Sequence, residues 1–552
     1  MGTAQLQGKK FIELVTGGAA NLQANVSIVN DLNVFPIPDG DTGDNMSLTM
    51  AGGIQAIEGC SEGSLSEISE KLAQGMLLCA RGNSGVILSQ LFAGLAKGFH
   101  GLDAANIKTV GFAIRSGVRR AYESVMKPTE GTMLTVAREA ADQACADITP
   151  ESTLESFLGE YLTEMNASLQ RTPELLSVLK EAGVIDSGGA GLVYLIDGMN
   201  RSLHGRTEKT DNITTKQKST DTRGFNENSV MKFGYCTEFL LQLQTCKVNL
   251  SSFSIKTITN YLDTVGDSVV AFQTGSIVKV HVHTMTPGSV LGFCQKYGEF
   301  LSVKIDNMAI QHNDSIVQNR FEISDGVPPQ KQKQFGVVTV ASGAGVQEAF
   351  RNLGADVVID GRDGKNPSTE DFMKAFDVVN AETVFVLPNN SDIIMAARQA
   401  AELYTKSDIR VLESRNIGDG YAALSMLSFD SGNVNEITDT LNQAMNGVVT
   451  GLVTTSTRDA TLNGVTIHEH DYIGFSEKNM IASSPSKTDT ARILLEKLGI
   501  SQKQVLIVIY GIDVTEEEKR MVRRYMTEHH SKVELFEIDG GQDIYSFMLI
   551  LE

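Results

Sequence analysis

Phe35-Pro-Ile-Pro-Asp-Gly-Asp-Thr-Gly-Asp-Asn-Met46 is the most informative stretch of this 552-residue chain. It places Asp39 and Asp41 two residues apart in a segment that Pro36 and Pro38 stiffen. Mg²⁺ in proteins keeps several waters and takes one or two carboxylates together with phosphate oxygens. The aspartate pair therefore predicts a magnesium site. The alternative is an ordinary solvated turn, which Asp-Gly also marks.

A second glycine-rich segment, Arg81-Gly-Asn-Ser-Gly85, follows one apolar run and precedes another. Small residues at a helix start let backbone N–H groups point at an anion, helped by the positive end of the helix dipole. We therefore interpret this segment as a phosphate loop, while the alternative is that Ser84 is simply the N-cap of the helix. The chain has no G-x-x-x-x-G-K-[ST] motif, so an ordinary P-loop is excluded.

Together these segments resemble the nucleotide-binding subunit of the dihydroxyacetone kinase family. That family has a G-D-x-D-x-G metal loop, an R-G-x-S-G phosphate loop and then a Thr-Met segment. Here the three read Pro38-Asp-Gly-Asp-Thr-Gly43, Arg81–Gly85 and Glu130-Gly-Thr-Met133, and Asp186-Ser-Gly-Gly-Ala-Gly191 closes the region. The resemblance implies an eight-helix barrel that holds Mg²⁺-ATP at one mouth.

Two departures from the family pattern bear on the metal. The family has a third carboxylate five residues before the first Asp of its pair, where this chain has Val34. Asn33 is the nearest polar substitute, and Asp31 is the alternative if the loop bulges. Thr42 replaces the family histidine. This divergent form resembles the catalytic subunit of the bacterial fatty acid kinases in length and three-part layout, so the resemblance extends over the whole chain.

The resemblance implies a role for each candidate residue. Asp39 and Asp41, with Asn33 or a water, would hold Mg²⁺ against the β- and γ-phosphates, and Thr42 joins the two aspartates as a catalytic candidate. The other candidates would contact the nucleotide. The phosphate loop would contact its phosphates, the Thr-Met segment would contact its adenine or ribose, and the last segment would close over the site. These residues are Asn45, Gly82, Asn83, Ser84, Gly85, Thr132, Met133 and Asp186.

Composition and charge narrow the class of protein. A content of 41% hydrophobic and 21% charged residues is ordinary for a globular protein, and 552 residues predict more than one domain. The formal charge of −20 argues against a nucleic-acid partner. No apolar run approaches the ~20 residues that span a bilayer, so we expect no stable membrane insertion. The N-terminus shows no signal peptide and the six cysteines form no C-x-x-C pair, which predicts a cytoplasmic location.

The resemblance implies that residues 1–204 are the kinase domain. They are predicted to be helical, because apolar residues recur there at three–four spacing. The predicted helices cover 6–30, 66–80, 84–98, 106–126, 131–147, 152–169, 173–182 and 188–202. Residues 205–228 are polar and rich in Thr, Lys, Asp and Asn, which indicates a linker.

Residues 229–328 are predicted to form a central domain with the element order βαββαβ, which indicates a ferredoxin-like α+β sandwich. Cys236 lies on the first predicted strand, which runs beside the third in such a sheet. His281 and His283 lie two residues apart on that third strand, so both face the same side. One Cys and two His suit zinc, and the resemblance implies the same ligands. The alternative is a buried hydrophobic cysteine and a half-exposed histidine pair.

Residues 333–552 begin with alternating strands and helices, which predicts a parallel sheet covered by helices. The part from 435 onward is predicted to carry more helices, with strands at Gln504–Tyr510 and Lys532–Glu537. This α/β region resembles the DegV-type fold of fatty-acid-binding proteins. Within it, Asn366-Pro-Ser-Thr-Glu-Asp371 is interpreted as a capping box, with Ser368 as the helix N-cap.

The chain is thus expected to be a multi-domain α and α/β kinase that uses ATP and Mg²⁺ to phosphorylate the carboxylate of a fatty acid. The resemblance implies that a separate fatty-acid-binding carrier protein presents the acyl chain, that the acyl phosphate serves phospholipid synthesis, and that the kinase forms a homodimer. Two alternatives stay open: a dihydroxyacetone or small-ketone kinase, and a non-catalytic ATP-binding regulatory scaffold.

Overall fold

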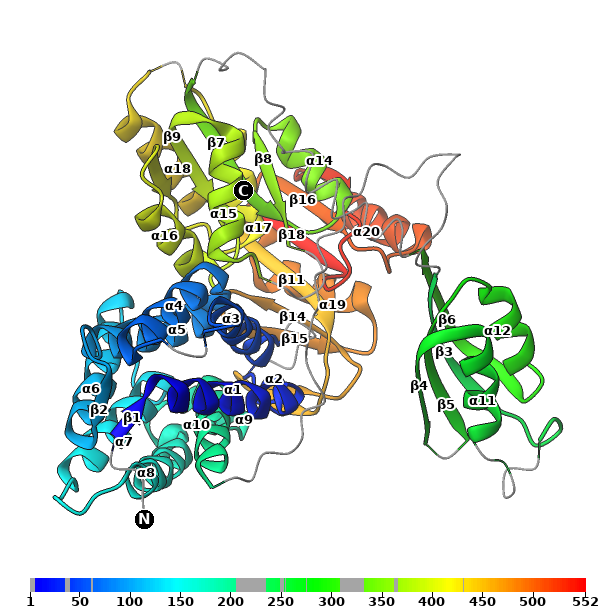
Figure 1. Ribbon diagram of the computed structural model, residues 1–552. Coiled ribbons are helices and arrows are strands. Elements are labelled where there is room, and N and C mark those ends of the chain that lie inside the picture. The colour runs from blue at the N-terminus through cyan, green and yellow to red at the C-terminus, as the bar shows by residue number, and fades with distance from the viewer. Residues whose placement is uncertain are drawn as a thin grey trace. The chain divides into compact units, whose positions relative to one another are not determined.

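The computed structural model describes residues 5–34, 40–60, 63–204, 235–248, 253, 255–274, 276–307, 332–361, 366–429 and 431–552. The chain forms two compact units (Figure 1). One consists of Met1–Asn212 together with Lys331–Glu552, and the other of Ile213–Gln330.

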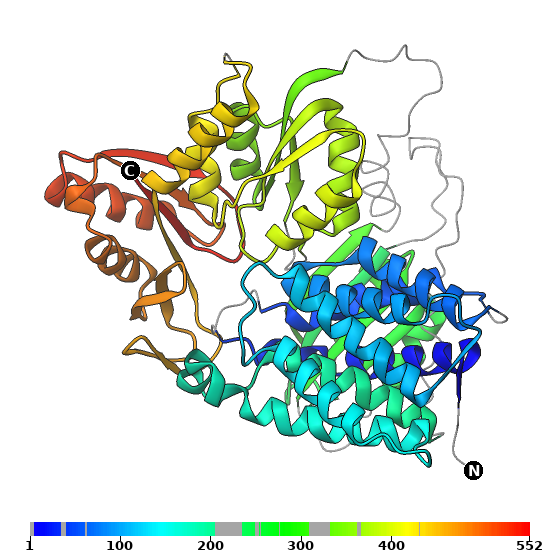
Figure 2. The same ribbon diagram turned by 90° about the vertical axis from the view of Figure 1, so that its left-hand side faces the viewer.

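The N-terminal part of the first unit is a ring of long helices (Figures 1 and 2). In ring order they are α1 (Gly8–Ala24), α3 (Thr42–Ala56), α4 (Leu65–Cys79), α5 (Gly82–Gly98), α6 (Ile107–Ser124), α7 (Met133–Ala146), α8 (Leu154–Leu175) and α10 (Ser187–Leu203). Each packs against the next, and α10 packs back on α1, which closes the ring. Two six-residue helices, α2 (Val26–Asp31) and α9 (Ser177–Ala182), lie between long ones. The predicted eight-helix barrel is confirmed.

One helix of the barrel was not predicted from the sequence. The predicted metal-loop stretch extends to Met46, but its residues from Thr42 onward form the start of helix α3. Glycine has poor helix propensity, and α3 contains three glycines. Two of them allow close packing on α4, since a β-carbon on Gly52 would lie 2.3 Å from Cys79 Cβ and one on Gly53 would lie 2.4 Å from Met76 Cγ.

The C-terminal part of the first unit begins with a four-stranded parallel sheet of strand order β10-β9-β7-β8. Its elements are β7 (Lys333–Ala341), α14 (Ala344–Asn352), β8 (Val357–Asp360), α15 (Thr369–Val379), β9 (Ala381–Leu387), α16 (Ile394–Leu403) and β10 (Asp408–Val411). The predicted parallel sheet with covering helices is confirmed. Its inner strands are apolar runs with most residues buried, as in β9, which is typical of a parallel sheet covered on both faces.

A second, mixed sheet of strand order β15-β14-β11-β18-β16-β17 follows. The prediction of more helices from 435 onward is wrong, because the described residues there contain eight strands and three α-helices. They are α18 (Val434–Gly447), β11 (Val449–Thr455), β12 (Ala460–Leu462), β13 (Val465–Ile467), β14 (Tyr472–Ser476), β15 (Asn479–Ser484), α19 (Lys487–Lys497), β16 (Val505–Tyr510), α20 (Glu516–His529), β17 (Glu534–Asp539) and β18 (Phe547–Leu551). The two predicted strands, Gln504–Tyr510 and Lys532–Glu537, correspond to β16 and β17. Strands of three residues, such as β12 and β13, are too short for periodicity to reveal.

The barrel and the C-terminal part of the first unit share a packed interface. Helix α15 lies against α4, and α16 lies against α5 (Figure 1). Ala80 and Val86 of the barrel are buried in one apolar cluster with Phe372, Phe376 and other side chains of the parallel sheet and its helices. The interface therefore has a hydrophobic core of its own.

The second unit has the predicted βαββαβ order. Its elements are β3 (Tyr235–Leu243), α11 (Lys256–Val265), β4 (Gly266–Thr274), β5 (Ile277–Thr284), α12 (Pro287–Cys294) and β6 (Gly298–Asn307). The sheet order is β4-β5-β3-β6 with every neighbouring pair antiparallel, which is the ferredoxin-like arrangement. The helices cover one face, where Ile258 and Leu262 of α11 pack with buried residues of β3 and β5.

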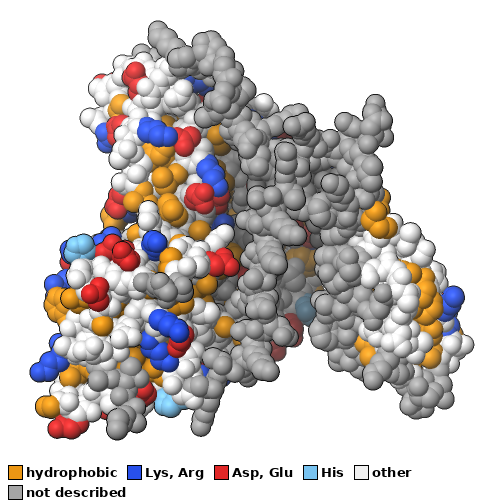
Figure 3. All heavy atoms as spheres, viewed as in Figure 1, with side chains coloured by type: hydrophobic (Ala, Val, Ile, Leu, Met, Phe, Trp, Pro, Cys, Tyr) orange, Lys and Arg blue, Asp and Glu red, His pale blue; other side chains and the backbone are white. Residues whose placement is uncertain are grey.

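The surface view shows Lys and Arg side chains scattered among Asp and Glu rather than gathered by sign (Figure 3). Among the residues that the structure describes, no helix combines the length and the apolar character that crossing a membrane requires.

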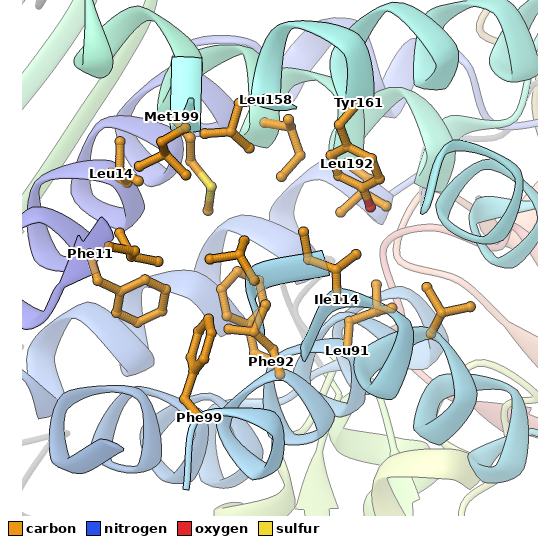
Figure 4. A pocket seen from close by; sticks show the side chains of 16 residues that line it. Phe11, Leu14, Leu91, Phe92, Phe99, Ile114, Leu158, Tyr161, Leu192 and Met199 are labelled. Atoms are coloured by element: carbon orange, nitrogen blue, oxygen red, sulfur yellow. The ribbon is translucent and has the colours of Figure 1, made fainter. Parts of the chain in front are cut away.

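The inside of the barrel is apolar and contains a cavity of about 90 Å³ (Figure 4). Phe11, Phe92 and Phe99 point into it from one side, and Leu158 and Met199 point into it from the other. Phe99 is fully buried, and its ring meets that of Phe11 edge-on with 6.1 Å between centroids. Polar chemistry must therefore take place at a mouth of the barrel and not within it.

Candidate functional site

Four helices of the barrel begin at the same mouth. Helices that follow one another in the ring run in opposite directions, so α3, α5, α7 and α10 share one polarity. Contacts at their first turns connect them. Ser187 Oγ of α10 lies 3.3 Å from Thr42 Oγ1 of α3, and a β-carbon on Gly188 of α10 would lie 2.9 Å from the methyl group of Met133 in α7. Four positive helix ends thus surround one site.

Side-chain capping differs between the two mouths. At the opposite mouth, the side chains of Ser64, Asn106 and Thr153 accept backbone N–H groups and cap α4, α6 and α8. At the shared mouth, the N-cap side chains of α3, α5 and α7 make no capping hydrogen bond within the described part of the chain. Side chains from elsewhere accept one N–H at two of these starts, Asn30 from Gly43 of α3 and Asp186 from Met133 of α7. The first N–H groups of a helix need a partner from outside the helix. The first N–H groups of the helices at the shared mouth point in a common direction, which suits an anion with several oxygens, such as a polyphosphate.

The phosphate loop and α3 are in close contact. Gly82 has a left-handed backbone with φ of 56°, and a β-carbon there would lie 2.4 Å from Asn45 Nδ2. Asn45 is 2% exposed, and its Oδ1 has no hydrogen-bond partner among the described atoms. A buried unpaired acceptor is unfavourable unless a ligand or water satisfies it. Helix α5 begins at Gly82, so Ser84 is its third residue and not its N-cap, which corrects that alternative.

Asn33, Thr42 and Ser187 form a hydrogen-bonded cluster beside Asp41. Thr42 Oγ1 donates to Asn33 Oδ1 at 2.8 Å, and Ser187 Oγ lies 3.4 Å from the same oxygen. Asn30 ties the start of α3 to α2, because its Oδ1 accepts from Gly43 N–H at 2.7 Å. The predicted metal ligand Asn33 therefore already orients Thr42, the catalytic candidate.

Asp186 is the N-cap of α10 and accepts a hydrogen bond from Gly189 N–H at 2.7 Å. Its burial raises the pKa of its carboxyl to about 6, although bonds from Gly189 and Met133 backbone N–H groups lower it. Thr132 precedes α7 and donates to the Thr129 carbonyl at 2.8 Å. Met133 is 3% exposed, and its backbone N–H donates to the Asp186 carboxylate.

Several predicted residues lie outside what the structure describes. Asp39 is one of them. The side chains of Cys236, His281 and His283 are others, although the backbone register pairs Cys236 with His283 on adjacent strands, as expected for the first and third strands. Within the described residues, no cluster of three or more His, Cys, Asp or Glu could hold a metal. The zinc assignment therefore stays a prediction.

Two residues from the C-terminal part reach this mouth and were not predicted. Asn366 Nδ2 donates to Asp41 Oδ2 at 2.8 Å, and Arg458 Nη2 donates to the Asn33 carbonyl at 2.5 Å. The predicted capping box next to Asn366 is confirmed, since Ser368 caps α15 and Asp371 bonds back to it. That interpretation explained Ser368 and Asp371 but overlooked Asn366, and only an aligned set of relatives would have drawn attention to it.

The described residues fit Mg²⁺ with a nucleoside triphosphate. Asp41 offers a carboxylate, the ligand type that Mg²⁺ prefers. The unpaired Asn45 oxygen suits a water of a hydrated cation, and the N–H groups at the start of α5, where the N-cap side chain makes no capping bond, suit phosphate oxygens. The absence of a side chain at Gly82 lets the Asn45 and Asn366 amides lie close against the backbone of the phosphate loop. This fold and site define a kinase-like nucleotide-binding barrel.

Comparison with known proteins names the family. Residues 36–201 match the DAK2 domain, 232–315 match the middle domain of the FakA-like fatty acid kinase proteins, and 336–552 match the C-terminal domain of the same proteins. Protein YloV of Bacillus subtilis is 38% identical, with 100% of both chains covered. The chain therefore belongs to the FakA-like fatty acid kinase family, and the predicted resemblance is confirmed.

Two solved structures are similar to parts of the chain. The dihydroxyacetone kinase of C. freundii, crystallised with AMP-PNP and Mg²⁺, has 20% identity and a TM-score of 0.28, and the match covers 35% of this chain and 33% of that one. DegV of Bacillus subtilis, a fatty acid binding protein, has 10% identity and a TM-score of 0.30, with 40% and 99% covered.

Proposed function

We propose that this protein is the catalytic subunit of a fatty acid kinase, which transfers the γ-phosphoryl group of ATP to a fatty acid held by a separate acyl-binding protein. Membership of a family described by its kinase role supports this proposal. The observation that carries it is that the starts of α3, α5 and α7, whose N-cap side chains make no capping bond, converge on Asp41 and on the buried Oδ1 of Asn45, which has no partner among the described atoms.

The chain's own residues would bind and orient the nucleotide. The N–H groups at the start of α5, together with the positive ends of α3 and α7, would hold the phosphates, and Asp41, with Asn33 or a water, would hold Mg²⁺. When bound, Mg²⁺ neutralises charge that develops on the β- and γ-phosphates. Thr132 and Met133 would border the adenine or ribose, and Asp186 would close the far side. Asp39 keeps the metal-ligand role that the sequence predicts for it.

The acceptor needs little activation. A carboxylate oxygen of the fatty acid attacks the γ-phosphorus while the bond from phosphorus to the ADP oxygen breaks, which gives an acyl phosphate and ADP. A fatty carboxylate is already ionised near neutral pH, so no general base is required. Positioning and electrostatics supply most of the catalysis in such transfers.

The acyl chain needs shelter elsewhere, because each CH₂ group kept from water is worth about 0.8 kcal/mol. The barrel cavity of about 90 Å³ is smaller than the ~150 Å³ cavity that holds one benzene ring in an engineered protein. This cavity cannot hold a long acyl chain, which supports presentation by a partner protein. Self-association of the kinase stays a prediction from the resemblance.

The test is an assay with full-length protein, Mg²⁺-ATP and a fatty acid loaded on an acyl-binding protein. We expect ADP release matched by acyl phosphate, which hydroxylamine traps as a hydroxamate. ADP release with dihydroxyacetone instead would indicate a small-ketone kinase. Nucleotide binding without ADP release from any acceptor would indicate a regulatory scaffold, and either result would overturn the proposal.

A matched pair of aspartate variants tests the site. Asp41→Ala should lower phosphoryl transfer about a hundred-fold or more while the melting temperature stays near that of wild type. Asp142→Ala is the control, because Asp142 has a side chain that is 63% exposed and pairs only with Arg115 among the contacts described. Equal activity of the two variants would remove Asp41 from the mechanism.

We also propose that the second unit binds zinc through Cys236, His281 and His283. The backbone register supports this, since Cys236 lies opposite His283 and His281 lies two residues along the same strand. Elemental analysis of purified protein should find zinc that the double variant Cys236→Ala, His281→Ala lacks. Untreated protein without zinc would overturn the assignment.

A further inference from the structure

The C-terminal part of the chain contributes a side chain directly to the metal-binding candidate. Asn366 Nδ2 donates to Asp41 Oδ2 at 2.8 Å across 325 positions of sequence. The same nitrogen would lie 3.1 Å from a β-carbon on Gly82, so Asn366 lies between the carboxylate and the phosphate loop. An amide donor is neutral, so it can fix the direction of a carboxylate without cancelling the charge that attracts a cation.

The position of Asn366 is itself fixed by backbone contacts with the phosphate loop. Arg81 Nη1 donates to the Asn366 carbonyl at 2.5 Å. Arg81 and Ser368 form an antiparallel β-bridge, and Thr369 N–H donates to the Ala80 carbonyl at 3.2 Å. The residues that lead into α15 are therefore attached to the start of the loop through one β-bridge and further backbone contacts, and these contacts fix the backbone that carries the Asn366 side chain.

A second residue from the C-terminal part holds the chain on the other side of the metal loop. The half-buried Arg458 follows β11 and donates to three backbone carbonyls, those of Asp31, Asn33 and Val34. A guanidinium has five donors in a planar fork and can bind several carbonyls at once, which an ammonium group cannot do with the same geometry. Arg458 contacts the metal-loop segment through backbone carbonyls, so its effect on the site must pass through Asn33.

We infer that Asn366 and Arg458 are positioning residues of the kinase site, and that the C-terminal part completes the cation-binding mouth of the barrel. Asn366 orients the Asp41 carboxylate. Arg458 binds the backbone around Asn33 and so keeps the Asn33 side chain next to Thr42. The inference rests on the proposed function only in taking a cation and a nucleotide to bind at this mouth. The opposite possibility is that Asn366 blocks the cation site and must leave before binding.

Nucleotide binding separates these two possibilities without any acceptor. Isothermal titration of full-length protein with Mg²⁺ and AMP-PNP should show about ten-fold weaker binding for Asn366→Ala, as expected for a lost hydrogen bond to a charged group. The control Asn435→Ala, at an exposed position of α18, should bind as wild type does. Unchanged or tighter binding by Asn366→Ala would overturn the inference, and tighter binding would identify Asn366 as a plug.

Hydrogen exchange in the nucleotide-free protein tests Arg458. Leu32 and Asn33 N–H groups donate to the carbonyls of Val29 and Asn30, so their exchange reports whether this segment is held. We expect Arg458→Met to speed their exchange about ten-fold, and Arg458→Lys to speed it less, because the charge stays but the fork is lost. Arg524→Met is the control, since Arg524 is 77% exposed in a surface pair with Glu528.

Equal exchange in Arg458→Met and wild type would overturn the role of Arg458. If Arg458→Met melts far below wild type, the comparison of Arg458→Lys with wild type becomes the test, because lysine keeps the charge and the stem length. Both readouts stay valid if no acyl phosphate forms in the enzyme assay, so failure of the proposed reaction and failure of this inference are distinguishable.

Discussion

Asn45 excludes a side chain at position 82, because Asn45 Nδ2 lies 2.4 Å from where a β-carbon of residue 82 would be. Gly82 also has φ of 56°, a conformation that costs an ordinary residue roughly 1–2 kcal/mol. We expect Gly82→Ala to lower the free energy of unfolding by at least about that amount and to weaken AMP-PNP binding. Calorimetric melting and nucleotide titration measure the two effects.

A second glycine provides a control of opposite sign. Gly159 lies within α8, and a β-carbon there would meet nothing within 4 Å. Gly159→Ala should therefore stabilise the barrel by roughly 0.5–1 kcal/mol and leave nucleotide binding unchanged. If both alanine variants shifted the melting temperature in the same direction, the steric account of Gly82 would be wrong.

Asp186 makes the unfolding free energy of the barrel depend on pH. Its carboxyl has a pKa of about 6 when folded against a reference of 3.8, so the folded state holds this proton more tightly than the unfolded state. The stability that this group contributes is therefore full below about pH 4 and is lost as pH rises through about 6. Relative to Asp186→Asn, wild type should lose roughly 2 kcal/mol of unfolding free energy between pH 4 and 7.

Asp186→Asn is the matched variant because asparagine is an equally good N-cap and does not titrate. The measurement is the difference between the melting temperatures of wild type and variant, taken at several pH values in that interval. A difference that stayed constant, or that favoured wild type as pH rose, would show that the Asp186 carboxyl is not destabilised by burial.

The sequence allowed prediction of the elements that have strong periodicity. Seven of the eight long barrel helices, the βαββαβ unit and the first parallel sheet follow from apolar spacing. Helix α3 was missed because its buried face is built largely from glycine, asparagine and threonine beside two methionines, which gives a weak apolar signal. The β12–β13 hairpin was also missed, although Asn463-Gly464, with φ of 51° and 77°, is a known hairpin turn pair.

The candidate site was predictable only where its residues are close in sequence. Gly82 to Gly85 and Asp41 stand in recognisable motifs, and the structure brings them to one mouth. Asn366 and Arg458 lie 325 and 425 positions from their partners, Asp41 and Asn33. Contacts at such separations depend on how two folded parts pack, and local spacing contains no information about that packing.

Gln399 links the C-terminal part to the barrel through buried hydrogen bonds. It is 5% exposed, its Nε2 donates to the Leu77 carbonyl at 2.6 Å, and its Oε1 accepts from Gln90 Nε2 at 3.0 Å. Gln399→Ala removes a partner of the Leu77 carbonyl, of Gln90 Nε2 and of Thr369 Oγ1, and each buried group left unpaired should cost roughly 1–3 kcal/mol. We expect the barrel and the C-terminal part to melt as two separate calorimetric transitions in this variant. A single transition at the wild-type temperature would show that the apolar cluster alone couples them.

Phe99 tests the barrel core itself. It is fully buried, lines the cavity and meets Phe11 edge-on, so Phe99→Ala should cost about 3–5 kcal/mol of unfolding free energy. Phe112, on the outside of α6, is 64% exposed, and Phe112→Ala should change stability by less than about 0.5 kcal/mol. Thermal melting of both variants measures the contrast. This core holds together the four helix ends of the proposed nucleotide site, so Phe99→Ala should also weaken AMP-PNP binding. Normal binding by a folded Phe99→Ala protein would mean that the mouth is held mainly by its own contacts and by the C-terminal part.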